Sequence, residues 1–581
     1  MLFEHYASAE RLEHALGSPL DPLTLLSFAQ AVELDERDAY PEAACAALDA
    51  WGLADYYIPR DAGGKLDSFE EALALWRVLA RRNLSVAVAH VKTFLGAIPV
   101  WVGGSAAQKQ RMAQLIKAGR QVALAYHEHA HGSDLSATAF VAQPMEGGYT
   151  LAGEKWLINN ATRSAAITLF ARTSAGGGPR GFSLFLLDKQ HVAAGSYSHL
   201  AQVKTHGVRG ADFSGIRVDN CYVPDSAVIG QPGAGMELSL RAFQLTRTLL
   251  PGLALGAADT ALRATLDFAL NRQLYGDAVF AIPHARGTLV NAFLDLLICE
   301  CVAISTARAV HIAPGRLRQW SAMAKYFVPT TIEQTVRDLA VVLGARHYLR
   351  EGHWSGIFQK MLRDVDVVSV FHAGTYLNLI TIQLQYLADQ RTPAGNPPAD
   401  AIDGRLAALF DLDRALPAFD PQRLELIDRG GDDLIAGVAA ALAQFEAMRA
   451  EPASDHALLD TLALLGRRLC EANAAQRDFL HDIKTRHGHA FSHAPELFDL
   501  AQRQSAIHAA ACCMHMWRFN RQHLSDFFRR GEWLALSLQR LLAPFGPGLA
   551  VSPAYSERTA QELARLHHEN MQFSIIPLQL P

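Results

Sequence analysis

The sequence predicts a mostly α-helical protein with a small β domain inserted between helical blocks. Apolar residues recur at helical spacing over residues 1–120, and short β-branched runs between glycine-rich turns fill residues 121–230. Helical spacing then returns over residues 231–390. A proline-rich break at residues 391–400 predicts a linker, and only helical patterns follow it, which predicts a C-terminal helical domain over residues 401–581.

In the first block, apolar spacing predicts helices near residues 22–29, 40–48 and 68–79, as in a helical bundle. Residues 57–64, Tyr-Ile-Pro-Arg-Asp-Ala-Gly-Gly, predict a turn because they combine a proline with paired glycines.

The second block, residues 121–230, is predicted to form a set of short strands. They are rich in β-branched and aromatic residues, and glycine-rich turns such as 176–181 separate them. The expected strands are 122–126, 149–153, 166–172, 182–187 and 213–218. The glycine-rich segment 230–235 is expected to lead the chain from the sheet into the next helix, because no βαβ unit surrounds it.

The amino-acid composition argues against some classes of binding partner. The chain has 581 residues, 50% apolar and 19% charged, with a net charge of −5 and no basic stripe, so we expect neither a nucleic acid nor a membrane surface as partner. Seven cysteines without a CxxC spacing predict neither a disulfide framework nor a zinc ribbon. No run of about 18 consecutive apolar residues and no basic leader are seen, so we expect a cytoplasmic protein.

Short motifs follow one another in a fixed order along residues 1–390. They include Ile58-Pro-Arg-Asp-Ala-Gly-Gly64, Gly132-Ser-Asp134, Lys204-Thr-His-Gly-Val-Arg209, Arg272-Gln-Leu-Tyr-Gly276 and Arg363-Asp364 with Gly374-Thr375. In order and spacing they resemble the acyl-CoA dehydrogenase family. The resemblance implies a helical bundle, a small β-barrel or sandwich, a four-helix bundle and bound FAD, with the C-terminal helical domain added.

Two β-domain motifs imply flavin contacts. His127-Glu-His-Ala-His-Gly-Ser133-Asp resembles the family's "T-E-P-x-x-G-S-D" loop beside the flavin ring, so we expect His127 and Ser133 at the cofactor, with imidazole replacing a threonine. Three histidines at alternate positions are also a metal-ligand pattern, but solvated histidines on a loop are commoner and we expect no metal.

The segment Gly153-Glu-Lys-Trp-Leu-Ile-Asn159-Asn-Ala resembles "G-x-K-x-W-I-T-N-G", which implies that Trp156 and Asn159 contact the flavin. Trp156 stands one place early, with Leu157 at the family's tryptophan position. Because side chains alternate along a strand, this shift turns Trp156 to the other face. A core position for Trp156 is the alternative.

Further cofactor contacts are implied later in the chain. Arg272 and Tyr275 match "x-R-x-x-F/Y-G", whose arginine meets the flavin diphosphate across a subunit interface, and guanidinium suits diphosphate through bidentate bonds. Gly344 matches a glycine that lets the backbone approach the cofactor. A shared site implies a homodimer or homotetramer.

The family's catalytic glutamate is missing. Counting from Arg363 places His372 at its position, and counting back from Gly374 places Ala373 there. The other location used in the family, before the arginine of the central helix, holds Thr246, and Thr246 and Arg247 are expected at the substrate. His372 is either the base, which its ordinary pKa allows, or a residue that fills the pocket.

These residues lead to an expected function and two alternatives. The first is an atypical FAD-dependent oxidoreductase that carries out α,β-dehydrogenation of an acyl thioester borne by CoA or an acyl carrier protein. The second is a flavin-dependent oxygenase or hydroxylase of the same superfamily. The third is a non-redox enzyme or binding protein that has lost FAD.

Overall fold

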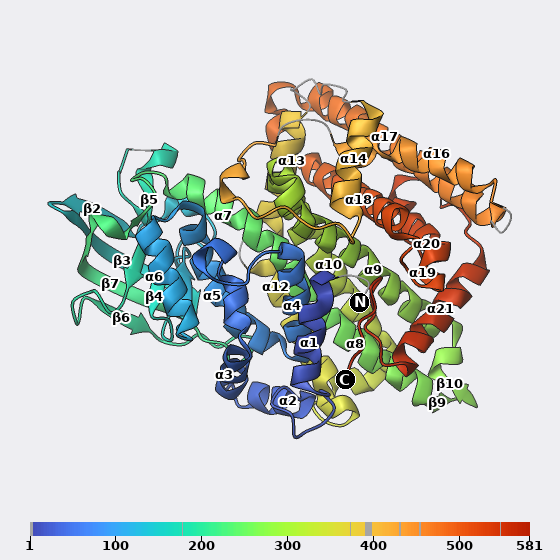
Figure 1. Ribbon diagram of the computed structural model, residues 1–581, viewed down its shortest axis with the longest axis horizontal. Helices are drawn as coiled ribbons and strands as arrows, with labels where there is room; N and C mark the ends of the chain where they lie inside the picture. The colour runs from blue at the N-terminus through green and yellow to red at the C-terminus, as the bar shows by residue number, and fades with distance from the viewer. Residues whose placement is uncertain are drawn as a thin grey trace.

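The computed structural model describes residues 4–176, 178–371, 374–389, 398–428, 432–451, 455–546 and 548–581. It confirms the predicted fold class, because one β-sheet domain lies between helical blocks (Figure 1). The domain boundaries at residues 120, 230 and 390 remain predictions. Residues 390–397, most of the predicted linker, lie outside the described part of the chain.

The N-terminal block is a helical bundle, and several of its helices begin at polar caps. The hydroxyls of Ser27, Ser68 and Ser105 each accept a hydrogen bond from a backbone N–H in the first turn of the following helix. Residues 22–27 therefore precede a helix rather than belong to one, which corrects the helix expected near 22–29. The helices are α1 (Ala7–Leu16), α2 (Phe28–Glu36), α3 (Glu42–Trp51), α4 (Phe69–Arg82), α5 (Leu84–Gly103) and α6 (Ala106–Lys117).

The β domain is an eight-stranded sheet in the order β6-β7-β3-β2-β4-β5-β8, with β1 paired to β4 in parallel. The strands are β1 (Val122–Ala125), β2 (Val141–Met145), β3 (Gly148–Asn159), β4 (Ala166–Arg172), β5 (Phe182–Asp188), β6 (Tyr197–Leu200), β7 (Phe213–Pro224) and β8 (Val228–Ile229). The strands β2, β6 and β8 were not predicted. A proline interrupts the apolar pattern of β2, and β6 has no buried residue.

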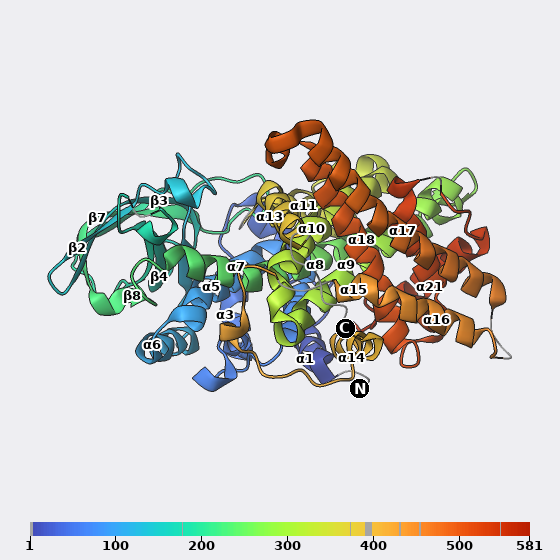
Figure 2. The same cartoon turned by 90° about the horizontal axis from the view of Figure 1, so that it is seen from above.

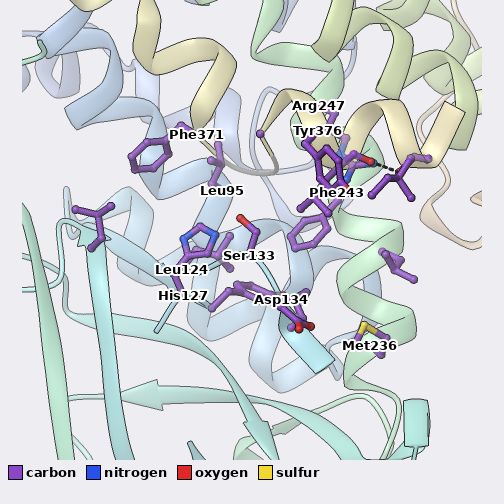
Figure 3. Close-up of a pocket in the computed structure, with 18 of the residues that line it drawn as sticks. Leu95, Leu124, His127, Ser133, Asp134, Met236, Phe243, Arg247, Phe371 and Tyr376 are labelled. Atoms are coloured by element: carbon purple, nitrogen blue, oxygen red, sulfur yellow. Dashed lines mark hydrogen bonds between the residues drawn. The ribbon is translucent and has the colours of Figure 1, made fainter. Parts of the chain in front are cut away.

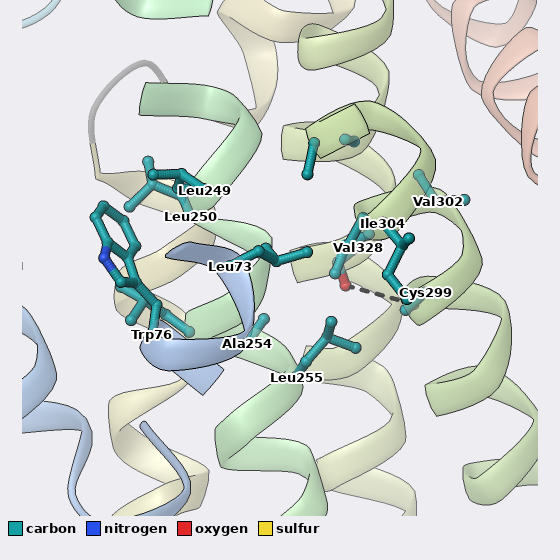
Figure 4. Close-up of a cluster of buried hydrophobic side chains, with 14 of the residues drawn as sticks. Leu73, Trp76, Leu249, Leu250, Ala254, Leu255, Cys299, Val302, Ile304 and Val328 are labelled. Carbon is teal, nitrogen blue, oxygen red and sulfur yellow. Dashed lines mark hydrogen bonds between the residues drawn. The ribbon is translucent and has the colours of Figure 1, made fainter. Parts of the chain in front are cut away.

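The second helical block forms the centre of the molecule. Its elements are α7 (Gly235–Leu249), α8 (Pro251–Asn271), the hairpin β9 (Gln273–Leu274) and β10 (Asp277–Ala278), α9 (Pro283–Ile312), α10 (Leu317–Leu343), α11 (Ile357–Asp364), α12 (Asp366–Val370) and α13 (Thr375–Asp389). Helix α4 of the first block packs on α8, so Trp76 and Leu73 join Leu255 and Val328 in one buried cluster (Figure 4). The two helical blocks therefore share a core.

The C-terminal helices pack against the central block on the side away from the sheet (Figure 2). Helix α18 contacts α9, α10 and α13. These helices are α14 (Ala399–Phe410), α15 (Asp433–Ala436), α16 (Val438–Met448), α17 (His456–His487), α18 (Glu496–Asn520), α19 (Asp526–Arg530), α20 (Glu532–Leu542) and α21 (Pro553–His568).

Two helices, α5 and α9, are apolar enough to be compared with membrane-spanning helices, which the sequence did not lead us to expect. By length and composition α5 and α9 could cross a membrane, but their most apolar windows are 94% and 83% buried inside the protein. A helix that is apolar on all sides suits a core position, and both helices have one here.

One buried ion cluster joins the first helix to the bundle. The Glu13 carboxylate accepts two hydrogen bonds of 2.6 Å from the Arg81 guanidinium and one of 3.1 Å from Arg82 Nε, and its side chain is fully buried. Burial alone would raise the pKa of Glu13, but Arg81 and Arg82 lower it from 4.5 to about 2.

This cluster predicts an acid-sensitive contribution to stability. Glu13→Gln should lower the free energy of unfolding by about 3 kcal/mol at pH 7, because two buried guanidinium groups lose their anion. The folded-state pKa is below the unfolded one, so the contribution is complete above pH 4.5 and disappears as the pH falls toward 2. Thermal unfolding from pH 7 to pH 2.5 measures it.

The matched control is Glu33→Gln, which removes an exposed pair with Arg37. That variant should cost less than about 1 kcal/mol at every pH. A Glu13→Gln protein that unfolds with wild-type stability at pH 7 would contradict the assignment.

Candidate active site

A cavity of about 630 Å³ lies where the β domain meets the helices (Figure 3). One wall comes from the end of β1, the loop after it and β3. The other comes from α5, α7, Phe371 and α13. The lining residues on the β wall are Leu124, Tyr126, His127, Ser133, Asp134, Leu135, Ser136, Leu157 and Asn159, and those on the helical wall are Lys92, Leu95, Met236, Leu240, Phe243, Arg247, Phe371, Gly374, Tyr376, Leu377, Ile380 and Thr381.

The loop after β1 is held in place by a buried ion pair. The Glu128 carboxylate accepts hydrogen bonds from Lys155 Nζ (2.8 Å) and from the backbone N–H groups of Ala139 (2.8 Å) and Phe140 (3.1 Å). Lys155 also donates to the Tyr126 carbonyl at 2.9 Å. This pair ties the loop to β3, so His127 and Ser133 reach the cavity from a fixed backbone.

A bulge in β3 decides which side chain enters the cavity. Trp156 pairs with Gly215 and Ile158 with Ser214, so Leu157 between them is unpaired and has φ of +57°. Leu157 lines the cavity. Trp156 does not; its ring packs edge-on against His129 with centroids 4.7 Å apart. Trp156 is half-buried, so it fits neither the expected flavin contact nor a full core position.

Asn159 presents an amide with no partner. Its side chain is 5% exposed and lines the cavity, and neither Oδ1 nor Nδ2 has a hydrogen-bond partner in the described chain. Buried amides are normally paired, because an unpaired one costs about 1–3 kcal/mol. The amide offers one donor and one acceptor to a ligand.

His127 stays neutral at physiological pH. Burial lowers its pKa to about 4, and the charges of Lys92 and Lys155 act in the same direction. A neutral imidazole has one N–H donor and one acceptor nitrogen, so His127 can offer a hydrogen bond of either kind to a ligand in the cavity.

The helical wall carries positive charge. Lys92 and Arg247 are 8% and 7% exposed and both line the cavity. Lys325 on α10 is buried nearby, and its ammonium donates to the Val368 carbonyl. Burial lowers the pKa of Lys92 to about 7, with a smaller contribution from the positive charge of Lys325. Burial likewise lowers the pKa of Arg247 to about 10, with a contribution from Arg318.

The Arg363-Asp364 motif fastens the helical wall to the β domain. Asp364 pairs with Lys360 and accepts a 2.6 Å hydrogen bond from the Val208 N–H. The Arg363 guanidinium donates to the Asp35 carboxylate (2.6 Å) and the His206 carbonyl (3.0 Å). Gly207 makes the approach feasible, since a Cβ there would lie 2.2 Å from the Arg363 carbonyl oxygen.

Three of the residues expected at the cofactor lie away from this cavity. Arg272 and Tyr275 belong to the β9–β10 hairpin at the end of the molecule opposite the sheet, and Tyr275 is 99% exposed (Figure 1). Gly344 begins a 3₁₀ helix, Gly344–Tyr348, in which Arg346 lies 5.9 Å from the Phe268 ring near the end of α8. Gly344 therefore lies at the same end as the hairpin.

The residues expected in catalysis or at the substrate differ in whether they line the cavity. Arg247 lines the cavity. Thr246 does not, and its buried hydroxyl donates to the Phe243 carbonyl at 3.2 Å. His372 lies outside the described residues, although Phe371 and Gly374 on either side in the sequence both line the cavity.

Sequence reasoning missed Lys92, Lys325 and Tyr376. A signal for Lys92 was present, because it is the lone lysine in the apolar run from Leu84 to Gly103. Such a residue is costly to bury and therefore a candidate for function.

The fold and this cavity correspond to a known family. Models of the acyl-CoA dehydrogenase N-terminal, middle and C-terminal domains match residues 27–120, 123–221 and 233–376. The chain therefore belongs to the acyl-CoA dehydrogenase family and is an enzyme of that class. The helices from Ala399 onward lie beyond these matches.

Individual relatives are distant. The short-chain specific acyl-CoA dehydrogenase of Sus scrofa mitochondria is 24% identical over 367 residues, which are 62% of this chain and 86% of that protein. Butyryl-CoA dehydrogenase from Megasphaera elsdenii has a TM-score of 0.60 at 18% identity, covering 66% of this chain and 98% of its own. A FAD complex of PigA has a TM-score of 0.58 at 21% identity, covering 66% and 96%.

Proposed function

We propose that this protein is a FAD-dependent oxidoreductase that desaturates an acyl thioester between Cα and Cβ, the acyl group being carried by CoA or an acyl carrier protein. The observation that carries the proposal is the cavity between the β domain and the helices, with the unpaired amide of Asn159 on one wall and cations on the other. The family and the FAD complex of a similar structure support it.

The residues of the β wall fit a flavin ring. Asn159 and neutral His127 offer donor and acceptor groups, as the imide edge of isoalloxazine requires, and Leu157 offers an apolar surface. FAD, when bound, supplies the group that accepts a hydride from Cβ. The protein supplies positioning and excludes water.

The Cα proton needs an acceptor, and the described lining holds one carboxylate, Asp134, on an exposed loop. We assign the proton to His372, whose sequence neighbours Phe371 and Gly374 line the cavity. An imidazole of ordinary pKa accepts a proton near neutral pH, and a positioned base contributes roughly 10²- to 10⁴-fold.

Assembly as a homodimer or homotetramer in the cytoplasm belongs to the same proposal. Arg272 and Tyr275 are exposed at the far end from the cavity, where a second copy could use them. In a dimer Arg272 would bind the FAD diphosphate of its partner, because guanidinium pairs with diphosphate oxygens through two bonds.

The cofactor assignment predicts a loss of affinity. Asn159→Ala should weaken FAD binding by about 10-fold, because one or two hydrogen bonds disappear. Trp156→Phe, its matched control on the same strand, should change the affinity less than about 3-fold. Fluorescence titration of flavin-free protein measures both. Equal losses in the two variants, or none in Asn159→Ala, would refute the role of Asn159.

The base assignment predicts a kinetic defect. His372→Ala should slow the anaerobic reduction of bound flavin by an acyl thioester at least roughly 10²-fold, with FAD retained. Stopped-flow absorbance at the flavin bands measures the rate, and the surface variant His191→Ala is the control. An unchanged rate in His372→Ala would eliminate this base. A flavin that reacts only after external reduction and with O₂ would favour an oxygenase instead.

A further inference from the structure

Two buried cations line the cavity, and the described residues give neither of them an anionic partner. Lys92 Nζ lies over the Phe371 ring, 3.8 Å from its centroid, and the described residues give it neither a hydrogen bond nor an ion pair. The described residues likewise give the Arg247 guanidinium no hydrogen bond and no ion pair, and its Nε is buried. Burying a charge without a partner is costly, and proteins retain such groups chiefly where a ligand completes them.

The groups around the two cations do not neutralise them. Lys325, behind the wall on α10, adds a positive charge, and Glu333 acts on Lys325 rather than lining the cavity. Asp134 is the single carboxylate in the described lining, and it sits on the exposed loop of the β wall, where its oxygen accepts hydrogen bonds from Ser136. The part of the helical wall that the structure describes therefore holds no anion.

Both cations enter the cavity from the helical wall, opposite the residues that fit the flavin ring, and Lys92 lies near enough to His127 for its charge to lower the pKa of that imidazole. Arg247 lies with Phe371 and Tyr376 on the helical side of the cavity, and His127 and Ser133 lie on the β side (Figure 3). The residues that fit the flavin ring are on the β side, and the one assigned to its diphosphate, Arg272, is at the far end of the molecule.

Much of the rest of the helical wall is apolar. Leu95, Leu240, Leu377 and Ile380 line it, together with Tyr376 and Thr381. A wall of this kind suits a short hydrocarbon chain that ends in a negative group, because the chain covers the aliphatic side chains and its end pairs with a cation.

We propose that the acyl group of the substrate carries a carboxylate besides its thioester, and that Lys92 binds this carboxylate. The inference rests on the thioester function proposed above and specifies its substrate class. Lys92 is then the residue that selects dicarboxylic monothioesters over fatty acyl thioesters.

Binding of unreactive thioethers tests the inference without any redox step. S-(4-carboxybutyl)-CoA and S-pentyl-CoA differ only in the terminal carboxylate, and calorimetry on the flavin-loaded protein gives both dissociation constants. The carboxylated probe should bind on the order of 10- to 100-fold more tightly, as expected for charge-assisted hydrogen bonds in an apolar site.

Variants then locate the preference. Lys92→Met should reduce it to less than about 3-fold while S-pentyl-CoA binds as before, and its melting temperature should not fall, because an unpaired buried charge has been removed. Lys92→Arg should keep most of the preference. Lys117→Met, on the exposed end of α6, should keep all of it.

Other outcomes would contradict either this inference alone or the proposed function as well. Equal binding of the two probes to the wild type, or a Lys92→Met variant that weakens both equally or loses its flavin, overturns the inference. If S-pentyl-CoA matches the carboxylated probe and straight-chain thioesters still bleach the flavin, the inference alone fails. If neither probe binds and no thioester bleaches the flavin, the proposed function fails with it.

Discussion

The burial of Lys92 and Arg247 in a largely apolar cavity is the constraint on which this site depends. In an ordinary core both side chains would be paired with a carboxylate, as Arg81 and Arg82 are with Glu13. Here the described protein offers no such partner, and their pKa values are lowered accordingly. An anion that enters the cavity would offset the cost of this burial, and this is the physical basis for proposing that the helical wall binds substrate.

Such a surface works only if the two walls are fixed relative to each other. Asp364 and Arg363 bind the 205–208 loop and α2 to the helical wall, and Glu128 with Lys155 fixes the loop that carries His127 and Ser133. The Arg363-Asp364 pair and Glu128 thus have structural roles in this chain. They hold the segments that carry cavity-lining residues and do not line the cavity themselves.

The sequence predicted the fold class because the period of its apolar residues changes where the β domain begins and ends. It missed β2 and β6, whose residues are too polar or too exposed to show a strand pattern. The prediction that His127, Ser133, Asn159 and Arg247 belong to one site came only through the family resemblance, since nothing in their spacing brings together residues so far apart; all four line the cavity. The sequence anticipated that Trp156 would turn away from the position that Leu157 takes, but not the β-bulge at Leu157 or the lack of a hydrogen-bonding partner for Lys92 among the described residues, because both depend on tertiary contacts.

The proposed function requires that this cavity binds a flavin. The visible absorption spectrum of the purified protein, after incubation with excess FAD and removal of the unbound cofactor, tests this requirement. We expect the absorption bands of a bound flavin with close to one FAD per chain. A colourless protein that retains its fold and takes up no FAD would contradict it.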